Sequence, residues 1–353
     1  MSSVLIFGVL RGMLRFLSQA ALAGSSRAHA FLTRALRSDT LFRGIIHRLA
    51  VADLGGKTPD KVYAESTNAC NARCVMCNRD TMQRKVGIME YGLFEHIANQ
   101  YAELGGREMR FHNFGEPMID PKLPQKVAYA KRLGIPSTVM YTNGSLLTEK
   151  MARDLMQAGL DALYVSFDGG TRESYERIRV GLSFEQVSNN VVRLMRLRSQ
   201  MQAGRPFVEL VLLPIDNDQD DVRRFQQTWK GVTDSVRVSA VHDFAGQGTA
   251  CSVAVASPVA HKHTKIPCYM PWRSMLVLWN GDVALCCMDF DGTTILGNAQ
   301  NQPLMEIWHG QPFRRVRGLH LDGDFSSLPL CRSCHVNAFP DCDSKLETLR
   351  LWL

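Results

Sequence analysis

The chain has 353 residues, which is enough for one large domain and a smaller one. Hydrophobic residues make up 45% and charged residues 21%, which is typical of a globular protein and excludes a wholly disordered chain, a collagen and a multi-span membrane protein. The net charge of +7 is concentrated in residues 1–50, which hold seven Arg, no Lys and one acidic residue, so the basic balance does not point to nucleic acid.

Residues 1–58 are predicted to form a basic helical arm. Apolar side chains recur at near-helical spacing between Leu5 and Leu17, but the longest apolar run is too short to span a bilayer. Such an arm suits packing on the body of the protein, binding to an anionic membrane surface, or a mitochondrial presequence. The membrane alternative implies peripheral contact through residues 1–50 and a lipid-linked substrate.

Residues 59–245 alternate between short strand-like runs and longer helical stretches. The predicted strands are 62–66, 108–112, 137–141, 162–167, 207–213 and 235–240. The predicted helices are 90–103, 121–133, 148–158, 171–178, 184–201 and 216–230. Six strand–helix repeats predict an α/β domain with a parallel sheet, either open or closed into a barrel. Catalytic groups are then expected in the loops after the carboxyl ends of the strands.

Residues 246–353 are predicted to form a separate small module. Cys, Pro, Trp and Gly are dense from about residue 264, and the first helix expected there spans 304–308. A module of this size cannot depend on core burial alone, which favours stabilisation by metal. Seven of the ten cysteines of the chain lie in compact metal-type spacings, which in a reducing compartment indicates metal or iron–sulfur ligands.

Three cysteines, Cys70, Cys74 and Cys77, follow the first predicted strand. Three thiolates can hold one cuboidal iron–sulfur cluster and leave its fourth iron open to a ligand. The alternative is a zinc site completed by His96 or His112, although zinc motifs favour paired two-residue spacings.

This Cys-x3-Cys-x2-Cys spacing, followed by strand–helix repeats, resembles the radical S-adenosylmethionine (SAM) superfamily over about residues 60–240. The resemblance implies a partial (β/α)6 barrel, with Cys70, Cys74 and Cys77 holding a [4Fe-4S] cluster and SAM at its open iron. Reduction of the cluster, by a flavodoxin- or ferredoxin-like donor, would cleave SAM to a 5′-deoxyadenosyl radical that abstracts a substrate hydrogen.

Further matches to this family fall at predicted strand ends. Phe114-Gly115-Glu116-Pro117 is similar to the family's Gly-Gly-Glu motif, with Phe114 in place of the first Gly, and implies that Glu116 binds the SAM amino group. Met76 would lie near the adenine. The SAM-binding residues implied are Met76, Gly115, Glu116, Pro117, Asn143, Ser166, Asp168 and Arg179. Each motif alone would also suit a turn or helix cap.

The second group of cysteines resembles the SPASM extension of radical SAM enzymes. Gly281 to Cys286 matches its Gly-x4-Cys element, but Pro340 stands where the full pattern has a further Cys. The match therefore implies the truncated, twitch-like form with one auxiliary cluster, most simply [4Fe-4S], ligated by Cys268, Cys286, Cys331 and Cys334. Cys287 is the rival of Cys286 and is otherwise expected to pack within this module. A four-Cys zinc ribbon is the alternative.

The implied activity is oxidation or epimerisation of a small-molecule, sugar or lipid-linked substrate. Residues 1–60 lack the strands of a leader-peptide-binding domain, which disfavours the alternative of a peptide-modifying maturase. A non-catalytic iron–sulfur or zinc scaffold is the alternative of a different class. The protein is expected to be cytoplasmic, or peripheral at the inner face of the membrane if the arm binds lipid.

Two details of the chemistry stay open in the sequence. Oxidation needs an electron acceptor such as the auxiliary cluster, whereas epimerisation needs a thiol that returns a hydrogen atom. Three cysteines are left for that role, Cys251, Cys287 and Cys342. A base for an alcohol proton is also needed in a dehydrogenase. The histidines and aspartate near predicted strand ends or the inter-domain link are His112, His242, Asp243, His261 and His263, and none is assigned.

Overall fold

The computed structural model of the chain describes residues 39–52, 58–216, 218–239, 241, 244–245, 247 and 267–334. The chain divides into two compact units: residues 58–257 with 273–313, and residues 1–57 with 258–272 and 314–353. This grouping differs from the predicted domain boundaries, which stay a prediction. Most of the predicted arm lies outside the described residues, so its membrane contact also stays a prediction. Among the described helices, none is long and apolar enough to cross a bilayer.

The larger unit is built on an open sheet of nine strands within the described residues, in the order β6-β5-β4-β3-β2-β1-β7-β8-β9. The strands are β1 (Lys61–Ala64), β2 (Glu108–Arg110), β3 (Ser137–Thr142), β4 (Ala162–Ser166), β5 (Phe207–Leu212), β6 (Ser235–Val238), β7 (Ser274–Val277), β8 (Asp282–Ala284) and β9 (Ile295–Asn298). Strands β1 to β6 pair in parallel, which confirms the six predicted strands and the α/β class. Strand β7 continues in parallel beside β1, and β8 and β9 follow antiparallel.

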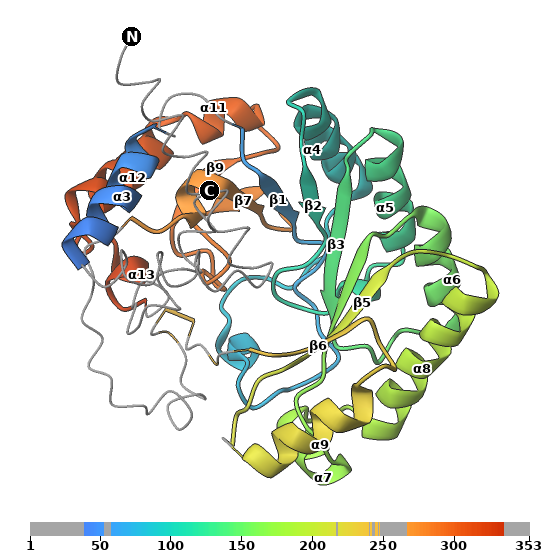
Figure 1. Cartoon of the computed structure of the whole chain (residues 1–353). Helices are drawn as coiled ribbons and strands as arrows, with labels where there is room; N and C mark the ends of the chain where they lie inside the picture. Colours follow the sequence, from blue (N-terminus) through green and yellow to red (C-terminus); the bar gives the residue numbers. More distant parts are fainter. Residues whose placement is uncertain are drawn as a thin grey trace. The chain divides into compact units, whose positions relative to one another are not determined.

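Helices cover the outer side of the parallel strands, with α4, α5, α6, α8 and α9 forming a layer in Figure 1. The helices of this unit are α4 (Tyr91–Glu103), α5 (Leu123–Arg132), α6 (Glu149–Ala158), α7 (Arg172–Ile178), α8 (Phe184–Gln200), α9 (Gln219–Trp229) and α11 (Leu304–Trp308), with two 3-10 turns, η1 (Asn78–Thr81) and η2 (Pro117–Ile119). Their ends follow local signals. In α6, the Thr148 hydroxyl accepts a hydrogen bond from the Met151 amide, and Gly159, at φ +85°, ends the helix. The predicted helices are confirmed to within three residues at each end.

Alternation along the strands separates an apolar face from a polar one. Val62 in β1 is level with Met109 in β2, and both side chains are fully buried. Tyr63 and Arg110, the next pair in register, both line a cavity. Because successive strand residues point to opposite faces, the second set of side chains is turned away from the apolar face. The inner side of this sheet is therefore partly polar.

The smaller unit contains α3 (Asp39–Ala52) and α13 (Pro329–Arg332), while α10 (Met270–Arg273) and α12 (Gln311–Asp322) each run across a boundary between the units. Helix α3 buries Ile46 and Leu49, and its Ala50 carbonyl accepts a hydrogen bond from the Trp272 indole at 3.0 Å. The His320 ring accepts one from the Cys268 amide at 3.1 Å. Helix α12 was not among the predicted helices.

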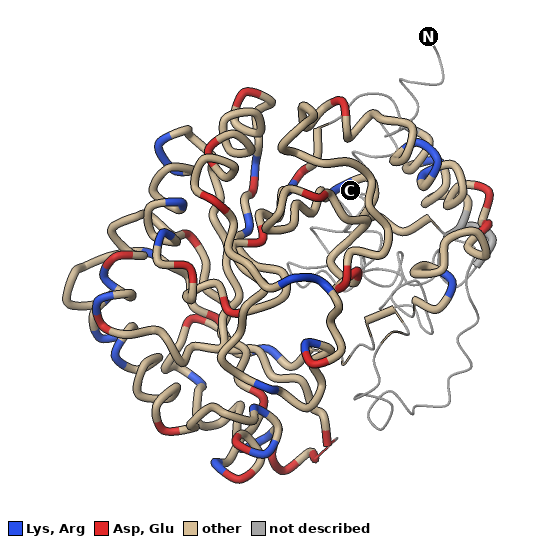
Figure 2. The backbone as a smooth tube through the Cα atoms, turned by 180° about the vertical axis from the view of Figure 1, so that it is seen from behind, with Lys and Arg blue, Asp and Glu red and all other residues tan. Residues whose placement is uncertain are grey.

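Charged residues of both signs are mixed along the outer helices of the larger unit, as Figure 2 shows. Exposed pairs one helical turn apart, such as Lys150 with Asp154, are part of this surface. The ion pair of Lys126 in α5 with Asp120 is buried instead: both side chains are fully buried and lie 2.6 Å apart. The Lys126 ammonium also donates to the Met89 carbonyl, so this pair anchors α5 to the segment before α4.

Candidate active site

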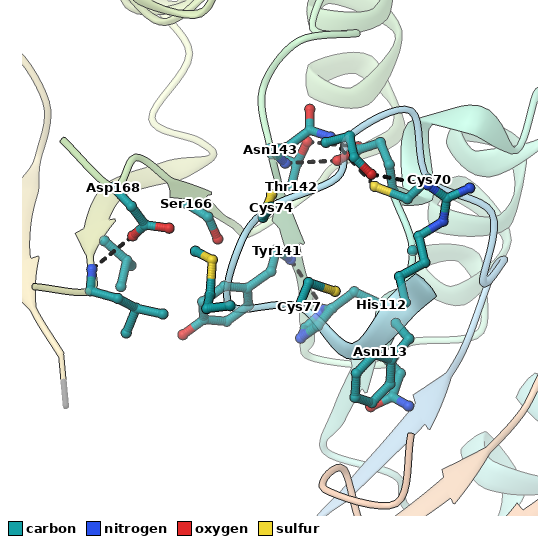
Figure 3. Close-up of a pocket in the computed structure, with 18 of the residues that line it drawn as sticks. Cys70, Cys74, Cys77, His112, Asn113, Tyr141, Thr142, Asn143, Ser166 and Asp168 are labelled. Carbon is teal, nitrogen blue, oxygen red and sulfur yellow. Dashed lines mark hydrogen bonds between the residues drawn. The ribbon is translucent and has the colours of Figure 1, made fainter. Parts of the chain in front are cut away.

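A cavity of about 430 Å³ lies at the carboxyl ends of the six parallel strands. The loops after all six strands contribute lining residues, which include Cys70 after β1, Glu116 after β2, Asn143 after β3, Asp168 after β4, Leu213 after β5 and Val241 after β6. Strand-end loops meet at one edge of a parallel sheet, so residues as far apart in the chain as Cys70 and Asp168 face the same space (Figure 3). The cavity lies where the catalytic groups are predicted, and their roles stay a prediction.

The three cysteines of the first motif all line this cavity and are free thiols in the structure. Their loop is held in shape by backbone hydrogen bonds from Arg73 to Val180 at 2.9 Å and from Val75 to Ile178 at 3.0 Å. Burial raises the pKa of the Cys77 thiol to about 11. In the described residues, no group of three or more His, Cys, Asp or Glu could hold a single metal ion. A cuboidal cluster does not need such a group, because each thiolate binds a different iron atom.

The loop of the Gly-Glu-Pro motif is packed directly against the cysteine loop. Gly115 has φ +97°, and a Cβ there would lie 2.6 Å from the carbonyl oxygens of Thr67 and Ala69, so only glycine fits. The next amide, of Glu116, donates to the Ala69 carbonyl at 2.7 Å. This close approach fixes the Glu116 carboxylate beside the residues that precede Cys70.

The Glu116 carboxylate is buried and held by three donors from two loops. Its Oε1 accepts from the Thr142 hydroxyl at 2.7 Å and the Met118 amide at 3.2 Å, and its Oε2 accepts from the Asn143 amide at 2.7 Å. Burial nevertheless raises the pKa of this carboxyl. A carboxylate oxygen can accept two hydrogen bonds, so Oε2 keeps one acceptor position for a cationic group such as the SAM ammonium.

Arg179 and Asp168 form a buried ion pair on the cavity wall. Asp168 Oδ1 also accepts from the Leu213 amide at 2.7 Å, and Arg179 Nη1 lies 3.5 Å from the Cys74 sulfur. The Nε of Arg179 is buried and has no hydrogen-bond partner among the described residues. An orphaned guanidinium donor beside the cysteines fits the carboxylate of SAM, as predicted for Arg179. The predicted ribose or methionine contact of Asp168 stays a prediction.

The apolar part of the cavity surrounds Met76, which packs against Ile178 with Leu213 and Val241 beside it. These side chains form a surface that suits the flat adenine ring. Of the predicted SAM-binding residues, all line the cavity except Pro117, which is buried and begins η2. Their predicted contacts with SAM stay predictions, but the residues present fit the group.

The second set of cysteines is divided between the two units. Cys286 belongs to the larger unit, whereas Cys268, Cys331 and Cys334 belong to the smaller one. Their role as ligands of an auxiliary cluster stays a prediction. Cys287 lines the cavity, and its expected packing within the C-terminal module stays a prediction. The residues Cys251, Cys342, His242, Asp243, His261 and His263 lie outside the described residues.

Several cavity residues were not singled out from the sequence. They come from the inner face of the strands and the loop after β2: Tyr63, Arg110, Asn113 and Arg237. The signal that could have found them is a polar residue at an alternating position of an apolar strand, as in Glu108-Met109-Arg110. His112, one of the unassigned histidines, lies among them (Figure 3).

The His112 ring is held between Tyr63 and Tyr141, with ring centroids 5.7 and 4.8 Å away, and its Nδ1 accepts a hydrogen bond from the Tyr141 amide at 3.1 Å. Burial, followed by the nearby Arg110 charge, lowers the pKa of His112 from 6.5 to about 3. The imidazole is therefore neutral near neutral pH, with its proton on Nε2.

The lowered pKa of His112 predicts a loss of stability in acid. Below its ordinary pKa of 6.5 the unfolded chain binds a proton that the folded chain does not take up until about pH 3. The free energy of unfolding should therefore fall with pH in this window, by at most about 1.4 kcal/mol per pH unit from this group. Urea unfolding of His112→Gln at about pH 7 and about pH 5 should show a smaller loss than the parent protein. An equal loss would contradict the assignment.

The open parallel sheet, with a cysteine loop after its first strand and a cavity at the strand ends, defines a protein of the (β/α)6 partial-barrel class. Residues 64–225 match the model of the Radical SAM superfamily, and residues 268–335 match that of SPASM, an iron-sulfur cluster-binding domain. The chain therefore belongs to the radical SAM superfamily and carries a C-terminal SPASM domain. These domains imply a [4Fe-4S] cluster, SAM and an auxiliary iron–sulfur cluster as cofactors.

Curated relatives with different activities match the chain. It is 24% identical over 285 residues to the S-adenosyl-L-methionine-dependent 2-deoxy-scyllo-inosamine dehydrogenase of Niallia circulans, covering 78% of this chain and 94% of that protein. It is 27% identical over 303 residues to the PqqA peptide cyclase of Gluconobacter oxydans, covering 78% and 82%. A GTP 3′,8-cyclase of Chlorobaculum tepidum is 34% identical, but the match covers only 42% of this chain and 44% of that enzyme.

Solved structures show the same fold. BtrN in complex with AdoMet and 2-DOIA matches with a TM-score of 0.53 and 20% identity, over 79% of this chain and 93% of that one. SuiB of Streptococcus suis bound to S-adenosylmethionine matches with a TM-score of 0.58 and 15% identity, over 85% and 79%.

Proposed function

We propose that this radical SAM protein removes a hydrogen atom from a small oxygen-rich molecule and thereby oxidises or epimerises it. The observation that carries the proposal is the continuity of one cavity from the cysteine loop to the polar inner face of the sheet. Its volume of about 430 Å³ falls in the range of small-molecule sites, and polar side chains from β1, β2, β3 and β6 line it.

The chain's own residues supply binding and orientation in this proposal. Cys70, Cys74 and Cys77 would hold the cluster, while Glu116 and Arg179 would hold the amino and carboxylate groups of SAM. The cluster and SAM, when bound, supply a one-electron chemistry that can take a hydrogen atom from an unactivated carbon. The polar inner face would place one carbon of the substrate toward Met76 and the cysteine loop.

The relatives support a small substrate without deciding the reaction. The 2-deoxy-scyllo-inosamine dehydrogenase is matched over nearly its whole length and is named for a small-molecule substrate. The PqqA peptide cyclase is matched over most of its length and is named for a peptide, so a peptide substrate is the second candidate. A reduced flavodoxin- or ferredoxin-like protein would deliver the electron to the cluster.

The test uses the anaerobically reconstituted protein with SAM, a reductant and fractionated small-molecule and peptide extracts. Enhanced formation of 5′-deoxyadenosine in a small-molecule fraction is expected, because substrate stimulates productive cleavage of SAM. A product two hydrogens lighter than the substrate would identify oxidation. A product of equal mass that takes up one deuterium from deuterated water would identify epimerisation.

Three results would contradict this function. Stimulation only by peptide fractions would favour the second candidate. A reconstituted protein that contains both clusters but forms no 5′-deoxyadenosine with any fraction would favour a non-catalytic scaffold. A protein that binds zinc in place of iron would point to the same conclusion.

A further inference from the structure

The part of the cavity formed by the strands and the loop after β2 differs chemically from the part that fits SAM. We define it as the inner wall, made of Tyr63, Arg110, His112, Asn113, Tyr141 and Arg237. The family's cysteine and Gly-Glu-Pro motifs contain none of these residues. Their hydrogen-bonding state therefore indicates what else the cavity was built to hold.

Two arginines give the inner wall a positive surface. Arg110 and Arg237 line the cavity, whereas the carboxylates that neutralise them, Glu108 and Glu209, do not. Arg110 Nε donates to Glu108 at 2.6 Å, and Arg237 Nε donates to Glu209 at 2.7 Å. The carboxylates thus do not line the cavity, whereas the two arginines do.

Arg110 has donor capacity left over. Its Nε is taken by Glu108, and its Nη1 donates to the Tyr63 hydroxyl at 3.3 Å. Its Nη2 makes no hydrogen bond within the described part of the chain. Because the Tyr63 oxygen accepts from Arg110, its own proton is left to donate elsewhere. The Tyr141 hydroxyl is in the same position, since it accepts from Arg237 Nη2 at 2.9 Å.

Asn113 adds one more free donor beside Arg110. His112 lines the same wall, but its ring already has hydrogen bonds with the Tyr141 amide and the Val139 backbone. The Nδ2 of Asn113 is buried and has no hydrogen-bond partner among the described residues. A buried donor without an acceptor is unfavourable by about 1–3 kcal/mol, so a ligand that accepts from it is stabilised.

The inner wall therefore presents hydrogen-bond donors and guanidinium groups, while the carboxylates paired with them do not line the cavity. A neutral polyol, which donates as often as it accepts, does not complement such a surface. An oxyanion complements it, because its oxygens only accept and guanidinium–oxyanion hydrogen bonds are among the strongest.

We propose that Arg110, with Tyr63 and Asn113, forms an oxyanion-binding subsite that holds a carboxylate or phosphate group of the substrate. This inference rests on the proposed function, in that the cavity takes a small molecule, and narrows the substrate to an acidic one. The oxyanion would anchor the molecule at the inner wall while another of its carbons faces the cysteine loop.

Binding to the reconstituted protein in the presence of SAM tests this subsite without turnover. The probes are inorganic phosphate and three compounds with one carbon skeleton: glucose 6-phosphate, gluconate and glucose. Equilibrium dialysis should detect phosphate and at least one acidic sugar, and glucose should bind at least about tenfold more weakly. The acidic sugar that binds more tightly indicates whether the natural substrate carries a phosphate or a carboxylate.

Arg110→Gln should weaken binding of the acidic probes about tenfold or more. Asn113→Ala, a smaller change, should weaken it in the same direction. Arg110→Lys keeps the charge but loses the forked geometry of the guanidinium group. Its affinity for the acidic probes should lie between those of the parent and of Arg110→Gln. The matched control is Arg107→Gln, since the Arg107 side chain is 74% exposed and lies just before the same strand without lining the cavity.

Failure to bind phosphate, or equal binding of glucose and the acidic sugars, would overturn the subsite. So would unchanged binding in both Arg110→Gln and Asn113→Ala when they fold as the parent does. These results would leave a neutral small substrate open. The proposed function itself is decided separately, by formation of 5′-deoxyadenosine with small-molecule fractions.

Discussion

Replacing Cys70, Cys74 and Cys77 together by Ala is expected to remove about four irons per chain and to abolish formation of 5′-deoxyadenosine. The three thiols line one cavity on a loop fixed by hydrogen bonds to the segment around Val180. Without them no thiolate in this loop is left to hold the cluster, so SAM has neither an iron to bind nor an electron to accept. Iron and sulfide are measured after anaerobic reconstitution, together with 5′-deoxyadenosine.

The control for this experiment is Cys287→Ala. Cys287 lines the same cavity but lies outside the first motif and outside the predicted ligand set, so this variant should keep the iron content of the parent protein. An unchanged iron content in the triple variant would contradict the assignment of the first motif. Loss of iron in Cys287→Ala would show instead that Cys287, not Cys286, is the ligand of the auxiliary cluster.

Replacing Lys126 by Met is expected to lower the free energy of unfolding by about 3–5 kcal/mol. Lys126 and Asp120 are both fully buried, and the substitution leaves the Asp120 carboxylate without its cation. It also leaves the Met89 carbonyl without the donor that it has at 2.6 Å. Urea unfolding followed by circular dichroism measures the change.

The matched control is Lys150→Met, which removes the lysine of an exposed ion pair; the Lys150 side chain is 84% exposed. Exposed pairs of this kind contribute about 0.3–0.5 kcal/mol, so its effect should be small. Adding Asp120→Asn to Lys126→Met should recover part of the loss, because a neutral amide is less unfavourable to bury than an unpaired charge. Similar losses in Lys126→Met and Lys150→Met would contradict this account.

The comparison with relatives does not identify the reaction, so the cavity residues have to be considered. A dehydrogenase and a peptide cyclase both match most of the chain, so the superfamily chemistry is shared while the substrates differ. The residues that differ in role between such enzymes are those that contact the substrate. In this chain the proposed oxyanion subsite around Arg110 is the part of the cavity that we expect to select the substrate.

The strand and helix positions were predictable because their signals are local. Each signal acts within a few residues of the element that it defines. Examples are the apolar runs of about six residues, the N-cap Thr148 and the C-cap Gly159. The cysteine loop and the Gly-Glu-Pro loop were predictable for a similar reason. Their chemistry lies in short motifs, and parallel strands bring the loops at their carboxyl ends to one edge.

The inner wall was not predictable in the same way. Tyr63, Arg110 and Arg237 belong to three strands spread over 175 positions of the chain, and only the pairing register places them on one face. A shift of one residue in that register would turn each of these side chains to the outer face. The position of Cys287 on the cavity wall likewise depends on how its segment packs in the larger unit.

The sequence by itself determined the order of strands and helices, the cysteine motifs and the cofactors that they imply. Only the tertiary structure decided which polar side chains share the cavity, that Arg179 is paired with Asp168 beside Cys74, and that His112 is held neutral. The physical reason is the distance along the chain between the residues that interact. Motifs and periodicity are properties of neighbouring residues, whereas hydrogen bonds, burial and the pKa of a buried group depend on residues that the fold brings together from distant positions.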